Sequence, residues 1–184
     1  MNVINLFENN KRYKFFEGDC LTIMKELDNE SINCIITSPP YWGMRKYDND
    51  SDKHEVGNEE DYTRYVKKLL LIFQEAKRIL KKNGSLWLNL GDKYYNKCLL
   101  GLPWRVAFAL MDDGWILRND VIWNQLKGTQ SCKDRLRDSY EHVFHFVKSK
   151  KYYYDADSIR IKPTKQPIIG KSKTVSSTGV SGKK

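Results

Sequence analysis

The chain has 184 residues, of which 40% are hydrophobic and 30% are charged. This length and composition are typical of one globular domain with a buried core. No apolar run approaches the roughly 18 residues that a membrane span needs. The first residues carry Glu8 and lack the basic segment of a secretory signal. We therefore expect a cytoplasmic protein without a membrane partner.

The net charge is +9, which favours a polyanionic partner. Six lysines and no acidic residue fall in residues 162–184, so the rest of the chain carries only +3. A solvated basic tail accounts for most of the excess. The charge alone does not identify the partner.

The cysteines and histidines do not form a recognisable metal pattern. No pair of cysteines has C-x-x-C spacing, and the three histidines do not complete a zinc motif. We expect four reduced thiols and no metal. The cysteines are Cys20, Cys34, Cys98 and Cys132.

Strand-like and helix-like stretches alternate along the chain, which predicts an α/β domain. The expected strands cover residues 13–16, 33–37, 85–90, 115–123 and 142–147, and the expected helices cover residues 21–27, 61–81 and 102–111. The helix over 61–81 should end at Lys81-Lys82-Asn83-Gly84, where basic residues precede a glycine. The strands on either side of it should be parallel, with a right-handed crossover.

The composition changes near the C-terminal end. Residues 152–161 are expected to be irregular, and from residue 162 Lys, Ser, Thr, Gly and Pro dominate. This composition is typical of a linker or a disordered end. We therefore assign residues 1–161 to one domain and residues 162–184 to a basic, polar tail.

The most informative segment is Thr37-Ser38-Pro39-Pro40-Tyr41-Trp42, directly after an expected strand. Ligands of open α/β sheets bind beyond the carboxyl ends of the strands. Two prolines make this loop rigid and end the strand, since proline cannot donate to a sheet ladder. Ser38 contributes a hydroxyl group, and the two aromatic residues contribute flat surfaces.

These groups suit the methylation of an exocyclic amine on a base. Such an amine is a poor nucleophile, because its lone pair is delocalised into the ring. Ser38 Oγ and the Pro39 carbonyl are candidate acceptors for its two N–H groups, which would localise that pair. A base in a duplex must be flipped out to be reached, and stacking on Tyr41 would return about 1–3 kcal/mol of the cost.

The chain resembles the amino-methylating DNA methyltransferases, specifically the cytosine-N4 group that carries Ser-Pro-Pro-Tyr before the cofactor loop. The adenine-N6 enzymes of that family usually carry Asp or Asn at the position of the serine. The resemblance covers residues 13–161 and rests also on the following segments: Gly18-Asp19-Cys20-Leu21, residues 78–92, Leu102–Ala107, Asp120–Asn124 and Asp138–Phe146.

The resemblance implies a Rossmann-like, S-adenosylmethionine-dependent methyltransferase fold with double-stranded DNA as the partner. It assigns catalysis to Ser38, Pro39, Pro40 and Tyr41. Asp19, Thr37 and Ser38 would contact S-adenosylmethionine, and Trp42 and Asp92 would line the base pocket. From the residues alone, Asp19 also fits a turn and Asp92 fits a loop-capping carboxylate. Trp123 and His142 are more typical of a core than of a site.

One element of the family pattern is missing. Its enzymes hold the methionine end of the cofactor with a Phe-x-Gly-x-Gly loop after a strand, where glycine permits close backbone approach. This chain has no such motif. We therefore expect an incomplete sheet without the cofactor-side strands, and a second chain or further segment that supplies them. The strand over 33–37 would then have an exposed edge, and the strand over 13–16 would have no neighbour.

Several alternatives remain open at this point. They are an adenine-N6 DNA methyltransferase, an RNA or protein methyltransferase, and a non-catalytic DNA-binding or assembly fragment. A cytosine-C5 methyltransferase is disfavoured, because the chain has no Pro-Cys dipeptide to supply its thiolate.

Overall fold

The computed structural model describes residues 2–4, 13–44, 55–125 and 133–161. Residues 1–153 form one compact unit, and residues 154–184 form a second. Within the described part of the second unit, the regular element is a short 3-10 turn, η1 (Asp157–Ile159). The tail expected over residues 162–184 lies outside the described residues.

A four-stranded mixed sheet is the centre of the first unit. Its strand order is β3-β4-β8-β7, and β3 is parallel to β4, whereas β8 pairs antiparallel with both β4 and β7. The expected parallel pairing of the two strands around the long helix is confirmed. The strands are β3 (Ile32–Thr37), β4 (Leu80–Leu90), β7 (Ile116–Asn124) and β8 (Tyr140–Val147).

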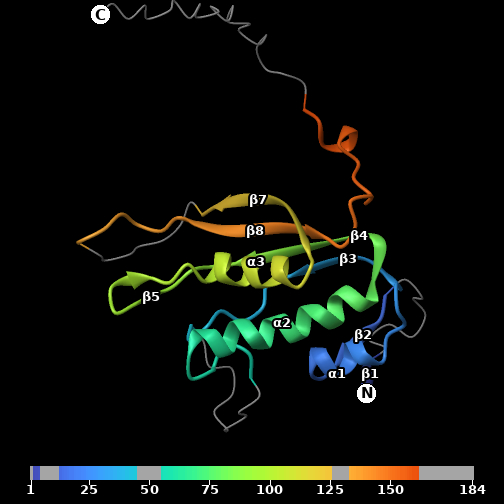
Figure 1. Cartoon of the computed structure of the whole chain (residues 1–184), viewed down its shortest axis with the longest axis horizontal. Coiled ribbons are helices and arrows are strands. Elements are labelled where there is room, and N and C mark those ends of the chain that lie inside the picture. Colours follow the sequence, from blue (N-terminus) through green and yellow to red (C-terminus); the bar gives the residue numbers. More distant parts are fainter. Residues whose placement is uncertain (1, 5–12, 45–54, 126–132, 162–184) are drawn as a thin grey trace, which may run out of the picture. The chain divides into compact units, whose positions relative to one another are not determined.

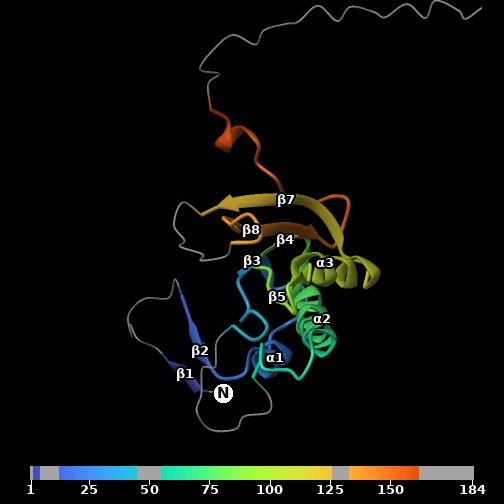
Figure 2. The ribbon, with the colours of Figure 1, turned by 90° about the vertical axis from the view of Figure 1, so that its left-hand side faces the viewer.

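The helices of this unit lie on one side of the sheet, as Figures 1 and 2 show. They are α1 (Cys20–Lys25), α2 (Tyr62–Ile79) and α3 (Leu102–Asp112). None of the helices in the described part of the chain is both long and apolar enough to cross a membrane.

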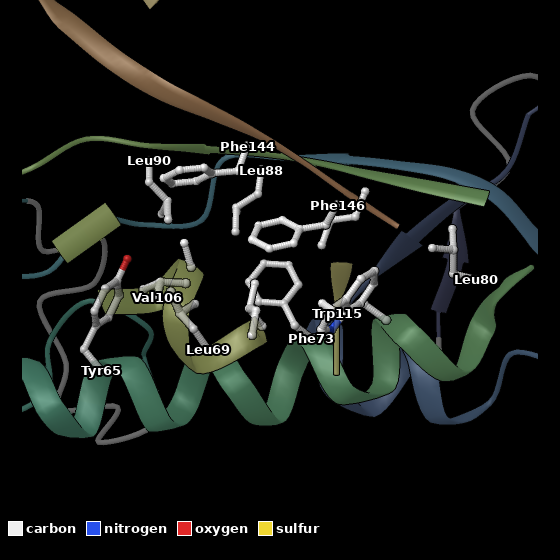
Figure 3. Close-up of a cluster of buried hydrophobic side chains, with 14 residues drawn as sticks. Tyr65, Leu69, Phe73, Leu80, Leu88, Leu90, Val106, Trp115, Phe144 and Phe146 are labelled. Atoms are coloured by element: carbon white, nitrogen blue, oxygen red, sulfur yellow. The ribbon is translucent and has the colours of Figure 1, made fainter. Parts of the chain in front are cut away.

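The core lies between α2, α3 and the helix-facing side of the sheet. Leu86, Leu88 and Leu90 alternate along β4 and are at most 2% exposed. Figure 3 shows α2 side chains, including Leu69 and Phe73, directed toward the leucines of β4 and the phenylalanines of β8. Burying each such side chain stabilises the fold by about 1.5–3 kcal/mol. Strand side chains alternate between faces, so Asn89 lies on the face away from the helices.

The long helix begins as expected but ends earlier. Asp61 Oδ1 accepts hydrogen bonds from the amides of Thr63 and Arg64, at 2.8 and 2.9 Å, which caps the first turn. The predicted end at residues 81–84 is wrong, because Leu80 is already extended, with ψ at 135°. Leu80 is fully buried and pairs with Ile32, so burial and sheet pairing take this residue out of the helix.

The strand predicted over residues 13–16 does have a neighbour, so that expectation is wrong. β2 (Phe15–Glu17) pairs antiparallel with β1 (Asn2–Ile4) in a separate two-stranded sheet. β1 has only three residues, too few for a strand pattern to be visible in the sequence. In the described ranges, β3 is an outer strand of its sheet.

A small hairpin between β4 and α3 was not predicted. It consists of β5 (Tyr94–Tyr95) and β6 (Cys98–Leu99). Asn96 and Lys97 form its two-residue turn with φ values of 48° and 61°. Positive φ at both positions is typical of a type I′ hairpin turn, which asparagine tolerates well.

Candidate active site

The loop after β3 is attached to α2 and to the segment before it. Tyr65 Oη donates a hydrogen bond to the Pro40 carbonyl at 3.1 Å, and Trp42 Nε1 donates to the Glu59 carbonyl at 2.9 Å. The ring of Tyr65 is buried, and this burial raises the pKa of its hydroxyl. Both attachments use neutral donors, so the loop position does not depend on a titrating group near neutral pH.

Tyr41 lies against the backbone of Gly91, directly after β4. A Cβ atom on Gly91 would come within 2.7 Å of Tyr41 Cε2, closer than van der Waals contact allows. The absent side chain of Gly91 therefore creates the space for the ring. Burial, with a contribution from Glu141, raises the pKa of Tyr41 to about 12, so this hydroxyl is protonated at neutral pH.

Glu141, at the start of β8, accepts hydrogen bonds from three side chains. Its Oε2 accepts from Tyr41 Oη at 2.8 Å and from Asn89 Nδ2 at 2.7 Å, and its Oε1 accepts from Gln125 Nε2 at 2.6 Å. Both carboxylate oxygens are thus held in place. The loop after β3, strand β4 and the end of β7 are connected through this one carboxylate.

Ser38 lies beside this network. Its Oγ is 3.3 Å from Tyr41 Oη and 3.4 Å from Asn89 Nδ2, and Asn89 Nδ2 is 2.9 Å from Tyr41 Oη. A carboxylate only accepts, so the Asn89 amide must present Nδ2 to Glu141. The other amide atom, Asn89 Oδ1, is then buried without a hydrogen-bond partner among the described residues.

A cavity of 490 Å³ opens next to this network. Its volume falls within the about 300–1,000 Å³ typical of small-ligand sites. Polar side chains converge on it from four segments, and an exposed indole and a methionine complete the wall. The lining residues are Ser38, Pro39, Pro40, Tyr41, Met44, Asn89, Trp123, Gln125 and Glu141.

A second cavity, of 270 Å³, shares Ser38, Pro39 and Pro40 with the first. Thr37 and Cys20 also line it, and the remaining lining residues are mostly apolar side chains of α1, α2 and β3. The segment from Ser38 to Pro40 is therefore a wall common to a polar cavity and an apolar one.

Asp19 precedes Cys20 and caps α1. Its Oδ1 accepts hydrogen bonds from Thr22 N at 2.9 Å and from Thr22 Oγ1 at 2.8 Å. These hydrogen bonds hold the pKa of Asp19 below its usual value, so the carboxylate is charged at neutral pH. The contacts of Asp19 with Thr22 are those of a turn, which the sequence also suggested for this residue.

Trp42 and Asp92, the two residues predicted to line the base pocket, are not among the residues that line the 490 Å³ cavity. The Trp42 ring packs edge-on between Tyr62 and Tyr95, with the Lys93 ammonium 5.0 Å from its centre, and it does not line the 490 Å³ cavity. Asp92 Oδ1 accepts from Leu102 N at 3.0 Å, which caps α3. Asp92 lines an adjoining cavity of 210 Å³ together with Tyr41 and Glu141.

The sequence interpretation missed Asn89, Gln125 and Glu141, and it treated Trp123 as core. Trp123 is 55% exposed and lines the 490 Å³ cavity. His142 is buried and bonded to Asp120 at 3.0 Å. The available signal was Asn89, a polar residue between Leu88 and Leu90, which are both buried.

The 490 Å³ cavity lies beyond the carboxyl end of β3, where α/β enzymes commonly bind their ligands, and polar side chains converge on it. Comparison with known proteins gives the family. The chain belongs to the N6/N4 DNA methylase family, whose profile, described as DNA methylase, matches residues 32–180. The family resemblance seen in the sequence is thereby confirmed, whereas membership of its cytosine-N4 group stays a prediction.

Individual relatives agree with this family. The chain is 40% identical over 175 residues to the type II methyltransferase M.Cfr9I of Citrobacter freundii, covering 79% of this chain and 57% of the relative. It is 37% identical over 196 residues to M.SmaI of Serratia marcescens, covering 90% of this chain and 66% of the relative. The chain thus spans between half and two thirds of the length of these relatives.

Solved structures confirm the fold. The PvuII DNA methyltransferase (cytosine-N4-specific) superposes with a TM-score of 0.63 at 24% identity, covering 78% of this chain and 53% of that one. A DNA modification methylase of Thermus thermophilus, crystallised with S-adenosyl-L-methionine, gives 0.58 at 20% identity, covering 77% and 57%. The fold is the Rossmann-like α/β fold expected from the sequence.

Proposed function

We propose that this chain is the catalytic part of a site-specific DNA methyltransferase that transfers a methyl group from S-adenosylmethionine to N4 of cytosine. The enzyme would serve a restriction-modification or phage system. The observation that carries the proposal is the position of Ser38–Pro40, which lines both the cavity beside Glu141 and the mostly apolar one. A base on one side and a methyl donor on the other would meet across this segment.

The polar cavity suits a flipped base. Ser38 Oγ and the Pro39 carbonyl are the proposed acceptors for the two amine hydrogens, and the Pro40 carbonyl is already bonded to Tyr65. Stacking on an aromatic side chain contributes about 1–3 kcal/mol toward the cost of flipping. Tyr41 lines this cavity, and so does the exposed ring of Trp123, which the structure adds as a second candidate surface.

The apolar cavity fits part of the cofactor. Its position beyond the carboxyl end of β3 suits a ligand of an α/β sheet, and Thr37 and Ser38 add hydroxyl groups to an otherwise mostly apolar lining. Asp19, charged and close in sequence to the lining residue Cys20, is the proposed contact for the adenosine end. When bound, S-adenosylmethionine supplies an electrophilic methyl carbon, and Ser38 and Pro39 hold the acceptor amine toward it.

The partners of the proposed enzyme are double-stranded DNA and a polypeptide with the glycine-rich cofactor loop, either a second chain or a further segment. Two observations support the second partner. No described strand pairs with the outer edge of β3, and the chain spans 57% of the length of M.Cfr9I. The match to a DNA methylase family favours DNA over RNA or protein as the substrate.

The product tests the proposal. The chain is combined with the part of M.Cfr9I that it does not match and incubated with S-adenosylmethionine and DNA. Mass spectrometry of the nucleosides should then detect N4-methylcytosine. N6-methyladenine as the only product would overturn the cytosine assignment and leave the amine chemistry intact. DNA that stays unmethylated, with cofactor and DNA both shown to bind, would favour the non-catalytic alternative.

A further inference from the structure

We infer that Glu141 is the final proton acceptor of this site, reached from the target amine through Ser38 and Tyr41. This inference rests on the proposed function. Glu141 does not touch the target amine itself and acts on it through Ser38 and Tyr41. The supporting geometry is the continuous contact from Ser38 Oγ to Tyr41 Oη at 3.3 Å and from Tyr41 Oη to Glu141 Oε2 at 2.8 Å.

The donor and acceptor of each hydrogen bond in this series follow from the carboxylate of Glu141, at which the series ends. A carboxylate cannot donate, so the single hydroxyl proton of Tyr41 points to Glu141. The Tyr41 oxygen then accepts from its other neighbours, Ser38 Oγ and Asn89 Nδ2. The hydroxyl proton of Ser38 is therefore directed toward Tyr41. One lone pair of Ser38 Oγ accepts from Asn89 Nδ2 at 3.4 Å, and the other remains for an incoming amine.

The same series of hydrogen bonds, from Ser38 through Tyr41 to Glu141, removes a proton after methyl transfer. The amine lone pair forms the new N–C bond and the electron pair of the old C–S bond stays on sulfur, so the amine nitrogen gains a positive charge. One proton passes from this nitrogen to Ser38 Oγ, the Ser38 proton passes to Tyr41 Oη, and the Tyr41 proton passes to Glu141. The products are a neutral methylated amino group on the base and a protonated Glu141, which returns its proton to water.

The surroundings of Glu141 keep its position fixed. Asn89 and Gln125 donate to its two oxygens, and the orientation of Asn89 leaves Asn89 Oδ1 buried and unpaired among the described residues. The Asn89 amide is therefore oriented with Nδ2 toward Glu141, which fixes the carboxylate.

Other titratable groups face Glu141 from the adjoining 210 Å³ cavity. Asp92 is bonded to backbone amides, Asp138 pairs with Arg135 at 3.1 Å, and His142 is bonded to Asp120. Tyr140 completes this set. Tyr41 Oη donates to Glu141, so Glu141 is the carboxylate that ends the hydrogen-bonded series from Ser38 among the described residues.

The first test needs no activity and uses the 184-residue chain combined with the polypeptide that is expected to stabilise it, with only the 184-residue chain labelled. Tyrosine ring carbons are labelled and titrated by NMR to about pH 11, where ordinary tyrosines are ionised. Tyr41, assigned with Tyr41→Phe, should stay protonated in the wild type and begin to ionise in Glu141→Gln. Asp120→Asn removes a carboxylate bonded only to His142 in this region and should leave Tyr41 unchanged. A Tyr41 titration unaffected by Glu141→Gln would overturn the inference.

The second test uses the chain combined with the polypeptide that restores methylation. In Glu141→Gln, the single-turnover rate should fall by about 10²-fold, the lower end for a positioned proton acceptor, and should rise with pH. The KM for DNA should stay unchanged, and Glu141→Asp should recover part of the rate. A purely structural Glu141 would instead raise KM without a pH slope.

The outcomes separate the two proposals. If the wild-type combination methylates DNA and Glu141→Gln does so at the same rate and with the same pH profile, the proton-acceptor role is wrong and the proposed function stands. If the wild-type combination binds cofactor and DNA but methylates nothing, the proposed function itself is wrong, and this role for Glu141 falls with it.

Discussion

The two cavities on either side of Ser38–Pro40 differ in how they are built. The polar cavity is lined from the loop after β3, from β4, from the end of β7 and from β8, and hydrogen bonds to Glu141 connect these elements. The apolar cavity is lined by α1, α2 and β3, next to the open edge of the sheet. The proposed base side is thus cross-connected by hydrogen bonds, whereas the proposed cofactor side borders an edge of the sheet that no described strand covers.

The strongest test of this difference is the chain on its own. We expect that residues 1–184 are marginally stable, do not bind S-adenosylmethionine measurably in calorimetry, and transfer no methyl groups. Adding a polypeptide with the glycine-rich loop should restore stability, binding and activity, since it would pair with β3 and provide the rest of the cofactor site. Cofactor-dependent methylation by the chain alone would contradict the difference between the two sides.

Replacing Ser38 tests the wall that both cavities share. In the combined enzyme, Ser38→Ala should lower turnover by about 10²–10³-fold, the usual loss for one preorganised polar contact, and should change DNA affinity much less. Ser31→Ala is the control, because the Ser31 hydroxyl bonds only to the Asp28 carbonyl in a turn before β3. Equal turnover in the wild type and Ser38→Ala would remove Ser38 from the mechanism.

Substitution of Gly91 tests whether the packing of Tyr41 stabilises the proposed base side. Gly91→Ala places a methyl group 2.7 Å from Tyr41 Cε2, and overpacking of this kind costs about 1–3 kcal/mol. Urea unfolding should show this loss. Combining Gly91→Ala with Tyr41→Leu should recover most of it, because the smaller side chain gives way. Additive effects of the two substitutions would mean that the ring and the methyl group do not meet.

Asp92 gives the smallest expected effect and separates capping from base recognition. Asp92→Ala removes the acceptor for Leu102 N and should lower the free energy of unfolding by about 1 kcal/mol, as for other lost helix caps. Asp112→Ala, at the opposite end of α3, should not destabilise the chain. If Asp92→Ala leaves stability unchanged but weakens binding of cytosine-containing DNA, the residue reads the base instead.

The local pattern of the sequence was sufficient for the main elements of the fold. Apolar periodicity located α2, α3 and the four strands of the sheet, and the strand–helix–strand order implied parallel β3 and β4. It did not locate the end of α2, because Leu80 leaves the helix through burial and pairing with Ile32. Periodicity within one segment contains no information about such long-range pairing.

The candidate site could also be predicted only in part from the sequence. Ser38 and Tyr41 are three residues apart, so one motif contains both. Glu141 meets Tyr41 across 100 residues and Asn89 meets Tyr41 across 48, and both contacts depend on the register between strands. Asn89 pairs with Val143 and Trp123 pairs with Glu141, which brings these side chains to one face of the sheet. A shift of one residue would place them on opposite faces.

The outer edge of β3 has an evolutionary consequence. Strands that join an edge are held mainly by backbone hydrogen bonds, which are the same for every sequence, and side chains select among them only through the rows on each face. On β3 the exposed row contains Cys34 and Ile36, the latter 81% exposed. We therefore expect selection on a joining strand to act mainly through the side chains that meet Cys34 and Ile36, and less through its other positions.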